Sequence, residues 1–154
     1  MTPPRRIGAQ AVLVHPASDR VLLLDIAHRP CGWLPGRSCM PHEPPATALR
    51  DAVRRQLGID LPLSGADLAA VDHTPGGRTA TESYHFVFVH RLTPADAGLA
   101  RPQERVPGLL GFEWVSPADL DAACRAYHVR RITHAVRAAL GRAAPAMLTA
   151  DQEC

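Results

Sequence analysis

A thiol, an imidazole and a carboxylate occur close together in the chain, at Cys39, His42 and Glu43. Side chains of these types can act as a nucleophile or as a general acid or base. Adjacent residues rarely point in one direction, however, and Glu43 directly precedes Pro44-Pro45. A carboxylate at that position can instead cap a following helix or match its dipole. The residues alone therefore leave two roles open, catalysis by the three side chains and helix capping by Glu43.

Metal binding by cysteine has little support in the sequence. The four cysteines contain no Cys-x-x-Cys pair, and Cys31, Cys39 and His42 lack the spacing of a known zinc site. We expect reduced thiols, as in a cytoplasmic protein. All seventeen basic residues are arginine, and the absence of lysine excludes a P-loop and a Schiff-base mechanism.

The bulk composition indicates one globular domain of 154 residues with 46% hydrophobic residues. We expect this domain to span residues 1–143 and residues 144–154 to form a flexible tail. The formal net charge is +2, which does not favour a dedicated nucleic-acid-binding protein. Apolar segments are too interrupted to span a membrane.

The hydrophobic pattern predicts where the candidate residues lie. Residues 9–15 and 20–26 read as a β-hairpin around a turn. Residues 46–57 have a helical pattern, with Pro45 in the first turn and Gly58 at the end. On this helix Asp51 and Arg55 are spaced i, i+4, which predicts a surface ion pair.

The second half of the chain predicts two strands, at residues 69–73 and 84–92, and a long loop at residues 93–108 of the kind that often lies over a ligand site. Residues 112–115 read as a short last strand, and Ser116 as the N-cap of the helical region that follows. The apolar face of the terminal helix is predicted from five residues: Val129, Ile132, Thr133, Val136 and Leu140.

This order of elements resembles the Nudix hydrolase family over residues 7–140. The family signature runs Gly, five residues, Glu, seven residues, Arg-Glu, an aliphatic residue, any residue, Glu-Glu, any residue, Gly and an aliphatic residue. A gap-free match places it on residues 37–59, and the segment that usually precedes it matches Leu34-Pro35-Gly36. Four signature positions agree: Glu43, Val53, Gly58 and Ile59. The resemblance implies an α/β fold, an α/β/α sandwich with a curved mixed sheet and with helix 46–57 and the terminal helix on different sides.

The other fixed positions of the signature differ. Arg37 replaces Gly and Asp51 replaces Arg, while Ala52, Arg55 and Gln56 replace the three helical glutamates. A register shifted by one places Arg54-Arg55 on the Glu-Glu pair, so both registers lose it. In the family, carboxylates on one helix face converge on Mg²⁺. A guanidinium about 5 Å from that ion would repel it by roughly 6 kcal/mol at an effective dielectric near 20. We therefore expect no metal ligands.

Three functions are compatible with this resemblance. The first is a repurposed enzyme that acts on a small metabolite in the Nudix cleft through His42, Glu43 or Cys39, without a metal. The second is a regulatory or binding module for a nucleotide-like ligand. The third is Mg²⁺-dependent hydrolysis of a nucleoside diphosphate derivative, with ligands drawn from Glu43, Glu104 or Asp51.

Under the first two hypotheses no cofactor is predicted. The expected partner is a small molecule that bears phosphate or carboxylate, and a homodimer is compatible with the sequence. The predicted substrate-binding residues are Trp33, Arg37, Arg55 and His85. The two arginines could replace a metal as the positive charge that holds an anion.

Overall fold

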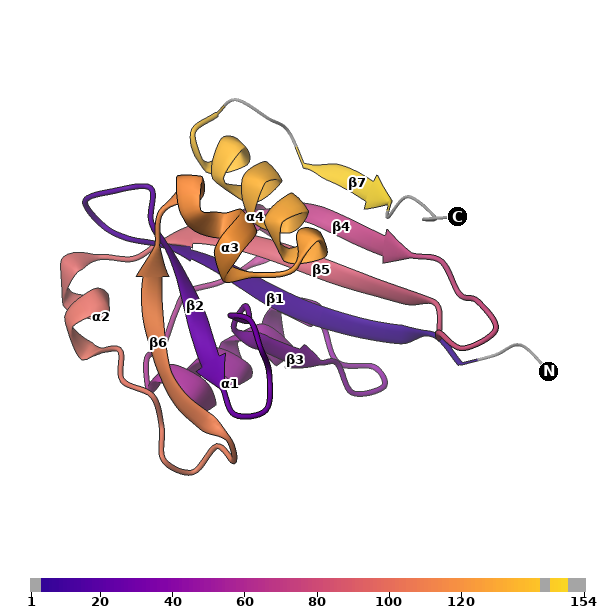
Figure 1. The fold of residues 1–154 in the computed structure, drawn as a ribbon, viewed down its shortest axis with the longest axis horizontal. Helices are drawn as coiled ribbons and strands as arrows, with labels where there is room; N and C mark the ends of the chain where they lie inside the picture. Colours follow the sequence, from indigo (N-terminus) through magenta and orange to yellow (C-terminus); the bar gives the residue numbers. More distant parts are fainter. Residues whose placement is uncertain (1–3, 142–144, 150–154) are drawn as a thin grey trace.

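The computed structural model describes residues 4–141 and 145–149. In this part of the chain a mixed sheet of seven strands runs in the order β6-β2-β1-β5-β4-β7, with β3 paired to β1 (Figure 1). Its strands are β1 (Arg6–Val14), β2 (Val21–Ile26), β3 (Gly36–Ser38), β4 (Leu68–Thr74), β5 (Ser83–Arg91), β6 (Leu109–Val115) and β7 (Ala146–Thr149). Helices lie on both sides of this curved sheet, so the predicted α/β/α architecture is confirmed.

The central strand β1 organises the sheet. It pairs in parallel with β5 along its whole length, from Arg6 to Val14. Its pairing with β2 is antiparallel, as the predicted hairpin requires, but it is confined to Val14 and Val21. Nearer the start of β1, residues 8–10 pair antiparallel with β3. β3 was not predicted from the sequence, because its three residues, Gly, Arg and Ser, carry no apolar alternation.

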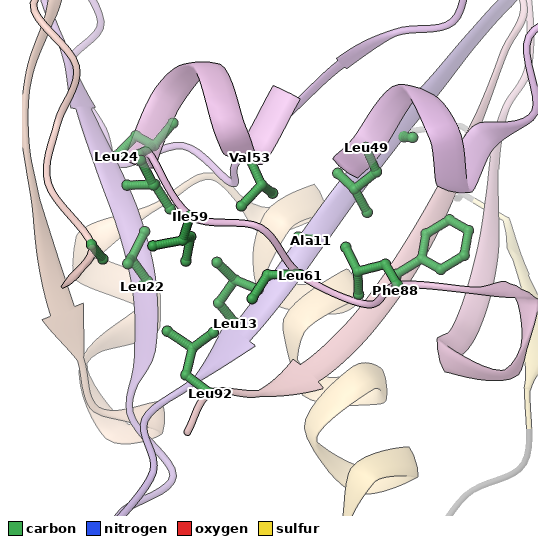
Figure 2. Packing of buried hydrophobic residues seen from close by; sticks show 14 residues of the cluster. Ala11, Leu13, Leu22, Leu24, Leu49, Val53, Ile59, Leu61, Phe88 and Leu92 are labelled. Atoms are coloured by element: carbon green, nitrogen blue, oxygen red, sulfur yellow. The ribbon is translucent and has the colours of Figure 1, made fainter. Parts of the chain in front are cut away.

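Helix α1 (Pro45–Leu57) begins with a proline in its first turn and ends at Gly58, which has φ 71°, as predicted. Its buried face carries Ala48, Leu49, Ala52, Val53 and Leu57. Leu49, Val53 and Leu57 share one core cluster with Ala11 and Leu13 of β1 and with Leu22 and Leu24 of β2, on one side of the sheet (Figure 2). Burial of this face fixes the rotation of α1.

The other side of the sheet packs against α3 (Leu120–Ala123) and α4 (Ala126–Ala139), around Val12, Val14 and Val87. The predicted apolar face of α4 is wrong in part, since Thr133 and Leu140 are exposed. The buried residues of α4 are His128, Arg131, Ile132 and Ala135. Two of these are polar, so a purely apolar pattern could not identify the face.

The 3-10 helix η2 (Pro117–Asp119) precedes α3, and Ser116 occupies its N-cap without a side-chain hydrogen bond. Residues 93–108, predicted as a loop, include the helix α2 (Pro94–Leu99), because the Thr93 hydroxyl accepts a hydrogen bond from the Asp96 amide at 3.1 Å. A second 3-10 helix, η1 (Gly65–Asp67), leads into β4.

The predicted tail, residues 144–154, contains β7, which pairs in parallel with β4. Without β7, β4 would leave a row of unpaired backbone groups at the sheet edge, and this pairing satisfies them. Residues 144 and 150–154 of that tail lie outside the described residues. Among the described helices, none has both the length and the apolar character that crossing a bilayer requires.

Candidate functional site

Two neighbouring cavities are lined in part by residues of β3 and α1. The larger, of about 730 Å³, lies between α1 and the loop before β6, and is lined by Arg37, Ala52, Arg54, Arg55, Gln56, Gln103, Arg105, Val106 and Pro107. The smaller, of about 360 Å³, lies over the start of β1, and its lining includes Gln10, Arg29, Trp33 and His85. Arg37 and Gln56 line both cavities, so the two cavities are neighbours.

Arg37, which lines both cavities, is the centre of an ion-pair network. Its two terminal nitrogens donate to the two carboxylate oxygens of Glu43, at 2.7 and 2.8 Å. Its Nε donates to Asp51 at 3.2 Å. Asp51 also accepts from Nε of Arg55 at 3.2 Å, so the ion pair predicted between these two residues is present. The guanidinium of Arg37 thus bridges the two carboxylates nearest to the helix face.

The network fixes the charges of its members. The hydrogen bonds from Arg37, with a further one from the Met40 amide, lower the pKa of Glu43 to about 2. Conversely, the hydrogen bond to Glu43 raises the pKa of Arg37 above its usual value. Glu43 is therefore an ionised acceptor at neutral pH and cannot act as a general acid there.

Gln56 joins α1 to β3 through a two-point contact with Gly36. Its Oε1 accepts from the Gly36 amide at 3.1 Å, and its Nε2 donates to the Gly36 carbonyl at 3.1 Å. An amide can supply one donor and one acceptor in this way, whereas an ionised carboxylate can only accept. Gln56 therefore holds the strand that carries Arg37.

The lining of the larger cavity contains four arginines and no carboxylate. Three of the four are balanced from outside the lining: Arg37 by Glu43 and Asp51, Arg55 by Asp51, and Arg54 by Asp60 at 2.5 Å. Among the described residues Arg105 has no such partner. Four guanidinium groups against three carboxylates leave a net charge of +1 at this cavity.

The smaller cavity combines aromatic and polar groups. The Arg29 guanidinium stacks over the Trp33 ring at 3.8 Å. His85 receives a hydrogen bond at Nδ1 from Arg131, at 3.3 Å. Burial lowers the pKa of His85 to about 4, and the positive charge of Arg131 contributes. The ring is consequently neutral at pH 7.

The predicted substrate-binding residues all lie at these cavities: Trp33 and His85 at the smaller, Arg55 at the larger, and Arg37 at both. The predicted catalytic residues do not line either one. Cys39 packs against the core on the α1 side of the sheet, and burial raises the pKa of its thiol, which disfavours the thiolate nucleophile. His42 is exposed in a turn with φ 66°.

Glu43 does not cap α1, in contrast to one of its two predicted roles. The N-cap position is Pro44, and no side chain makes a cap hydrogen bond there. Pairing with Arg37 draws the carboxylate toward β3 instead. Among the described residues no group of three or more His, Cys, Asp or Glu side chains could hold a metal ion. Glu104 is exposed and outside both linings.

Sequence reasoning missed several lining residues, above all Arg105 and Gln10. Arg105 lies in the loop suspected of covering a ligand site, but no local pattern distinguished it from its neighbours. Gln10 lies in an apolar strand, where a lone amide is an anomaly. That anomaly was the available signal, since a buried amide needs a hydrogen-bond partner.

No protein-family model and no curated protein matches this chain. Solved structures do match it. A MutT protein from Methanosarcina mazei Go1 has a TM-score of 0.69 and 17% sequence identity, over 90% of this chain and 98% of that one. An ADP-ribose pyrophosphatase from Streptococcus suis has a TM-score of 0.69 and 15% identity, over 96% and 99%.

A third match is the NUDIX domain of Shewanella oneidensis NrtR complexed with ADP ribose. Its TM-score is 0.69 at 14% identity, over 90% of each chain. The backbone likeness spans nearly the whole chain, whereas the low identities leave the chemistry of the cleft to its own residues. Together with the sheet order and the two helical layers, these matches show that the chain has the Nudix hydrolase fold.

Proposed function

We propose that this protein is a metal-independent binding module for a nucleotide-like ligand that carries phosphate groups. The observation that carries the proposal is the position of the Arg37 guanidinium, which bridges Glu43 and Asp51 beside the arginine-lined cavity. In this proposal a fixed organic cation beside α1 takes over the charge that the family resemblance assigns to a divalent ion. Guanidinium groups bind phosphate through paired hydrogen bonds and do not need a metal.

Magnesium does not fit this cleft. The helix face that the signature assigns to metal ligands carries Ala52, Arg55 and Gln56, and Gln56 is already bonded to Gly36. The two nearest carboxylates, Glu43 and Asp51, are bonded to Arg37. An approaching divalent cation would have to displace one guanidinium and would meet the charge of others. Mg²⁺-dependent hydrolysis therefore has little support.

Catalysis by Cys39, His42 and Glu43 has less support than binding. The Cys39 thiol is packed against the core, Glu43 is locked as an ionised partner of Arg37, and His42 lies in an exposed turn. None of the three lines a cavity with a second one. A nucleophile and its base must be within hydrogen-bond reach of each other.

The size and lining of the two cavities support a two-part ligand. The larger, positively charged cavity suits a diphosphate, and the smaller one has an aromatic ring and polar side chains suited to a base or sugar. Two of the matched structures have names that mention ADP-ribose. Nucleoside diphosphates and their sugar derivatives are therefore the ligand class to test.

The decisive experiment records melting temperature and product formation together. The protein is incubated with ADP-ribose, ADP, UDP-glucose or inorganic pyrophosphate, each with EDTA or with Mg²⁺. In EDTA we expect the melting temperature to rise with ligand concentration and to do so saturably, by an amount that depends on the ratio of ligand concentration to the dissociation constant. We expect no product. Product that requires Mg²⁺ would establish the hydrolase hypothesis instead, and metal-free product would establish the repurposed enzyme.

A matched pair of variants locates the binding site. Arg105→Gln removes a positive charge that has no carboxylate partner among the described residues. The substitution therefore leaves no carboxylate without its ion-pair partner. Loss of one charge-assisted hydrogen bond should weaken pyrophosphate binding by roughly tenfold or more. Arg137→Gln, on the exposed side of α4, is the control and should bind like the wild type. Equal affinities of the two variants would contradict the proposed site.

A further inference from the structure

Arg131 of α4 is a buried arginine whose donors are distributed over three side chains. It is 3% exposed. Its Nε donates to the carboxylate of Asp72, which is fully buried in β4, and Asp72 also accepts from Arg130 at 3.0 Å. Its two terminal nitrogens donate to Oε1 of Gln10 at 2.7 Å and to Nδ1 of His85 at 3.3 Å. Asp72 thus holds the guanidinium in one orientation.

This arrangement sets the polarity of Gln10 and His85. A guanidinium has five N–H donors and no acceptor, so both atoms that face it must accept. The amide of Gln10 therefore turns its oxygen toward Arg131 and its NH₂ group away. The neutral ring of His85 must carry its proton on Nε2, because Nδ1 is the acceptor. The NH₂ group of Gln10 and the Nε2–H group of His85 therefore remain as donors that do not face Arg131.

Gln10 and His85 both line the smaller cavity, together with Gly8. Gly8 pairs with His85 across β1 and β5, and two residues along β1 lies Gln10, on the same face of the sheet. A Cβ on Gly8 would lie 2.8 Å from Cδ2 and 3.2 Å from Nε2 of His85. The Cδ2–Nε2 edge of the ring therefore lies over Gly8, in the space that a side chain at this position would fill.

We propose that Arg131, oriented by Asp72, makes Gln10 and His85 a pair of obligate hydrogen-bond donors that selects a ligand edge with two acceptors. Arg131 and Asp72 are positioning residues, and Gln10 and His85 determine specificity. The inference rests on the proposed function, because it names the second half of the same ligand. The arginine-lined cavity selects for phosphate, whereas the donor pair selects the group that is attached to the phosphates.

The neutral state of His85 supports this assignment. Burial and the charge of Arg131 lower its pKa, with Arg6 acting in the same direction and Asp72 opposing them. A second proton on the ring would face the Arg131 guanidinium. The donor pair therefore stays in one form around neutral pH, and it discriminates between edges by hydrogen-bond polarity and not by charge.

Guanine and adenine provide matched probes of this polarity. The edge of guanine with N7 and O6 has two acceptors, whereas the same edge of adenine has one acceptor and one donor. Two fixed donors suit guanine, and a buried mismatch of donor against donor is costly. We expect GDP to bind about tenfold more tightly than ADP, and inorganic pyrophosphate to bind without regard to the pair.

The first measurement needs no ligand. Nitrogen NMR of the imidazole rings distinguishes a protonated nitrogen from an unprotonated one, and the His85 signals are assigned by their loss in His85→Gln. We expect an unprotonated Nδ1 and a protonated Nε2 in the wild type at pH 7. A proton on Nδ1 would overturn the inference directly.

The second measurement compares dissociation constants for GDP, ADP and pyrophosphate. His85→Phe keeps an aromatic ring but removes the donor, so the preference for GDP should shrink to within about twofold while pyrophosphate affinity is kept. His85→Gln restores an N–H donor and should recover part of the preference. His90→Phe, on the opposite face of β5, is the control.

The two proposals fail in different ways. Equal affinities of the wild type for GDP and ADP, with pyrophosphate still bound, would overturn the donor pair and leave the arginine-lined site intact. Absence of pyrophosphate binding would overturn the proposed function, whereas the protonation of His85 would still be measured independently. A preference for GDP that survives in His85→Phe would exclude His85 as its source.

Discussion

Arg37 and Glu43 form a two-point ion pair, with N–O distances of 2.7 and 2.8 Å, at the place where the chain passes from β3 into α1. The geometry is that of a guanidinium binding a carboxylate side by side, the strongest form of such a contact. Because Asp51 of α1 shares the same guanidinium, the pair also ties the loop to the helix. Replacing this cation should therefore affect both the stability and the ion selectivity of the cleft.

Arg37→Met should lower the melting temperature at pH 7, because Glu43 and Asp51 would face each other without their shared cation. The folded-state pKa of Glu43 is about 2, below its ordinary 4.5. Its stabilising effect is therefore fully present above pH 4.5 and is lost as the pH falls through about 2. The gap between variant and wild type should shrink over that window. Arg137→Met serves as the control, and a gap that does not change with pH would contradict the ion pair as its cause.

A metal site should appear when the helix face is given carboxylates. The combined variant Arg37→Gly, Ala52→Glu, Arg55→Glu and Gln56→Glu places three carboxylates at i, i+3 and i+4 and removes two nearby cations. We expect Mg²⁺ at saturating concentration to raise its melting temperature by roughly 5 °C and not to raise that of the wild type. Ala52→Glu alone keeps both cations and is the matched control. An equal Mg²⁺ response from the wild type would contradict the proposed metal independence.

The helices and strands could be predicted from the sequence where their formation depends on residues that are close together in the chain. Helix α1 begins at a proline and ends at Gly58 because proline suits a first turn and glycine suits a left-handed C-terminus. Apolar runs located β1, β2, β4, β5 and β6 to within a few residues. These signals depend only on neighbours in the chain, so one sequence is enough to read them.

The candidate site was less predictable because it depends on partners far away in the chain. Arg131 lies outside the predicted apolar face of α4, yet it is buried against Asp72, 59 residues earlier. Glu43 looked like a helix cap and pairs with Arg37 instead. The short strands β3 and β7 form only because β1 and β4 offer them an edge. Such long-range pairing leaves no periodic pattern in the sequence.

Gly36 should tolerate no side chain. A Cβ at this position would lie 2.1 Å from the Ala9 carbonyl oxygen, which is backbone and cannot rotate away. Gly36→Ala should cost about 3 kcal/mol or more of unfolding free energy and should loosen the bonds from Gln56. Gly65→Ala, where nothing lies within 4 Å of the added methyl group, should cost much less. Urea denaturation of both variants tests this, and similar losses would show that β3 can move away from β1.

His128 should make the fold sensitive to mild acid. The side chain is fully buried in α4, and neither ring nitrogen has a hydrogen-bond partner among the described residues. Burial and the charge of Arg131 lower its pKa to about 3, from an ordinary value of 6.5. The folded state therefore keeps the neutral ring, whereas the unfolded chain takes up a proton once the pH falls below 6.5. Stability is fully present above that value and is lost as the pH falls toward 3.

His128→Phe separates this effect from general acid denaturation. Between pH 7 and pH 5 the wild type should lose about 2 kcal/mol of unfolding free energy through His128 alone, and His85, whose pKa of about 4 also lies below this window, should add a loss of comparable size in the same direction. Phenylalanine keeps the edge-to-face contact that His128 makes with Trp33 at 4.6 Å and has no nitrogen to leave unpaired. The variant should therefore be as stable as the wild type at pH 7, or about 1 kcal/mol more stable, with a shallower fall toward pH 5. Urea denaturation at the two pH values measures both quantities, and parallel pH profiles would mean that His128 is hydrated or protonated in the folded protein.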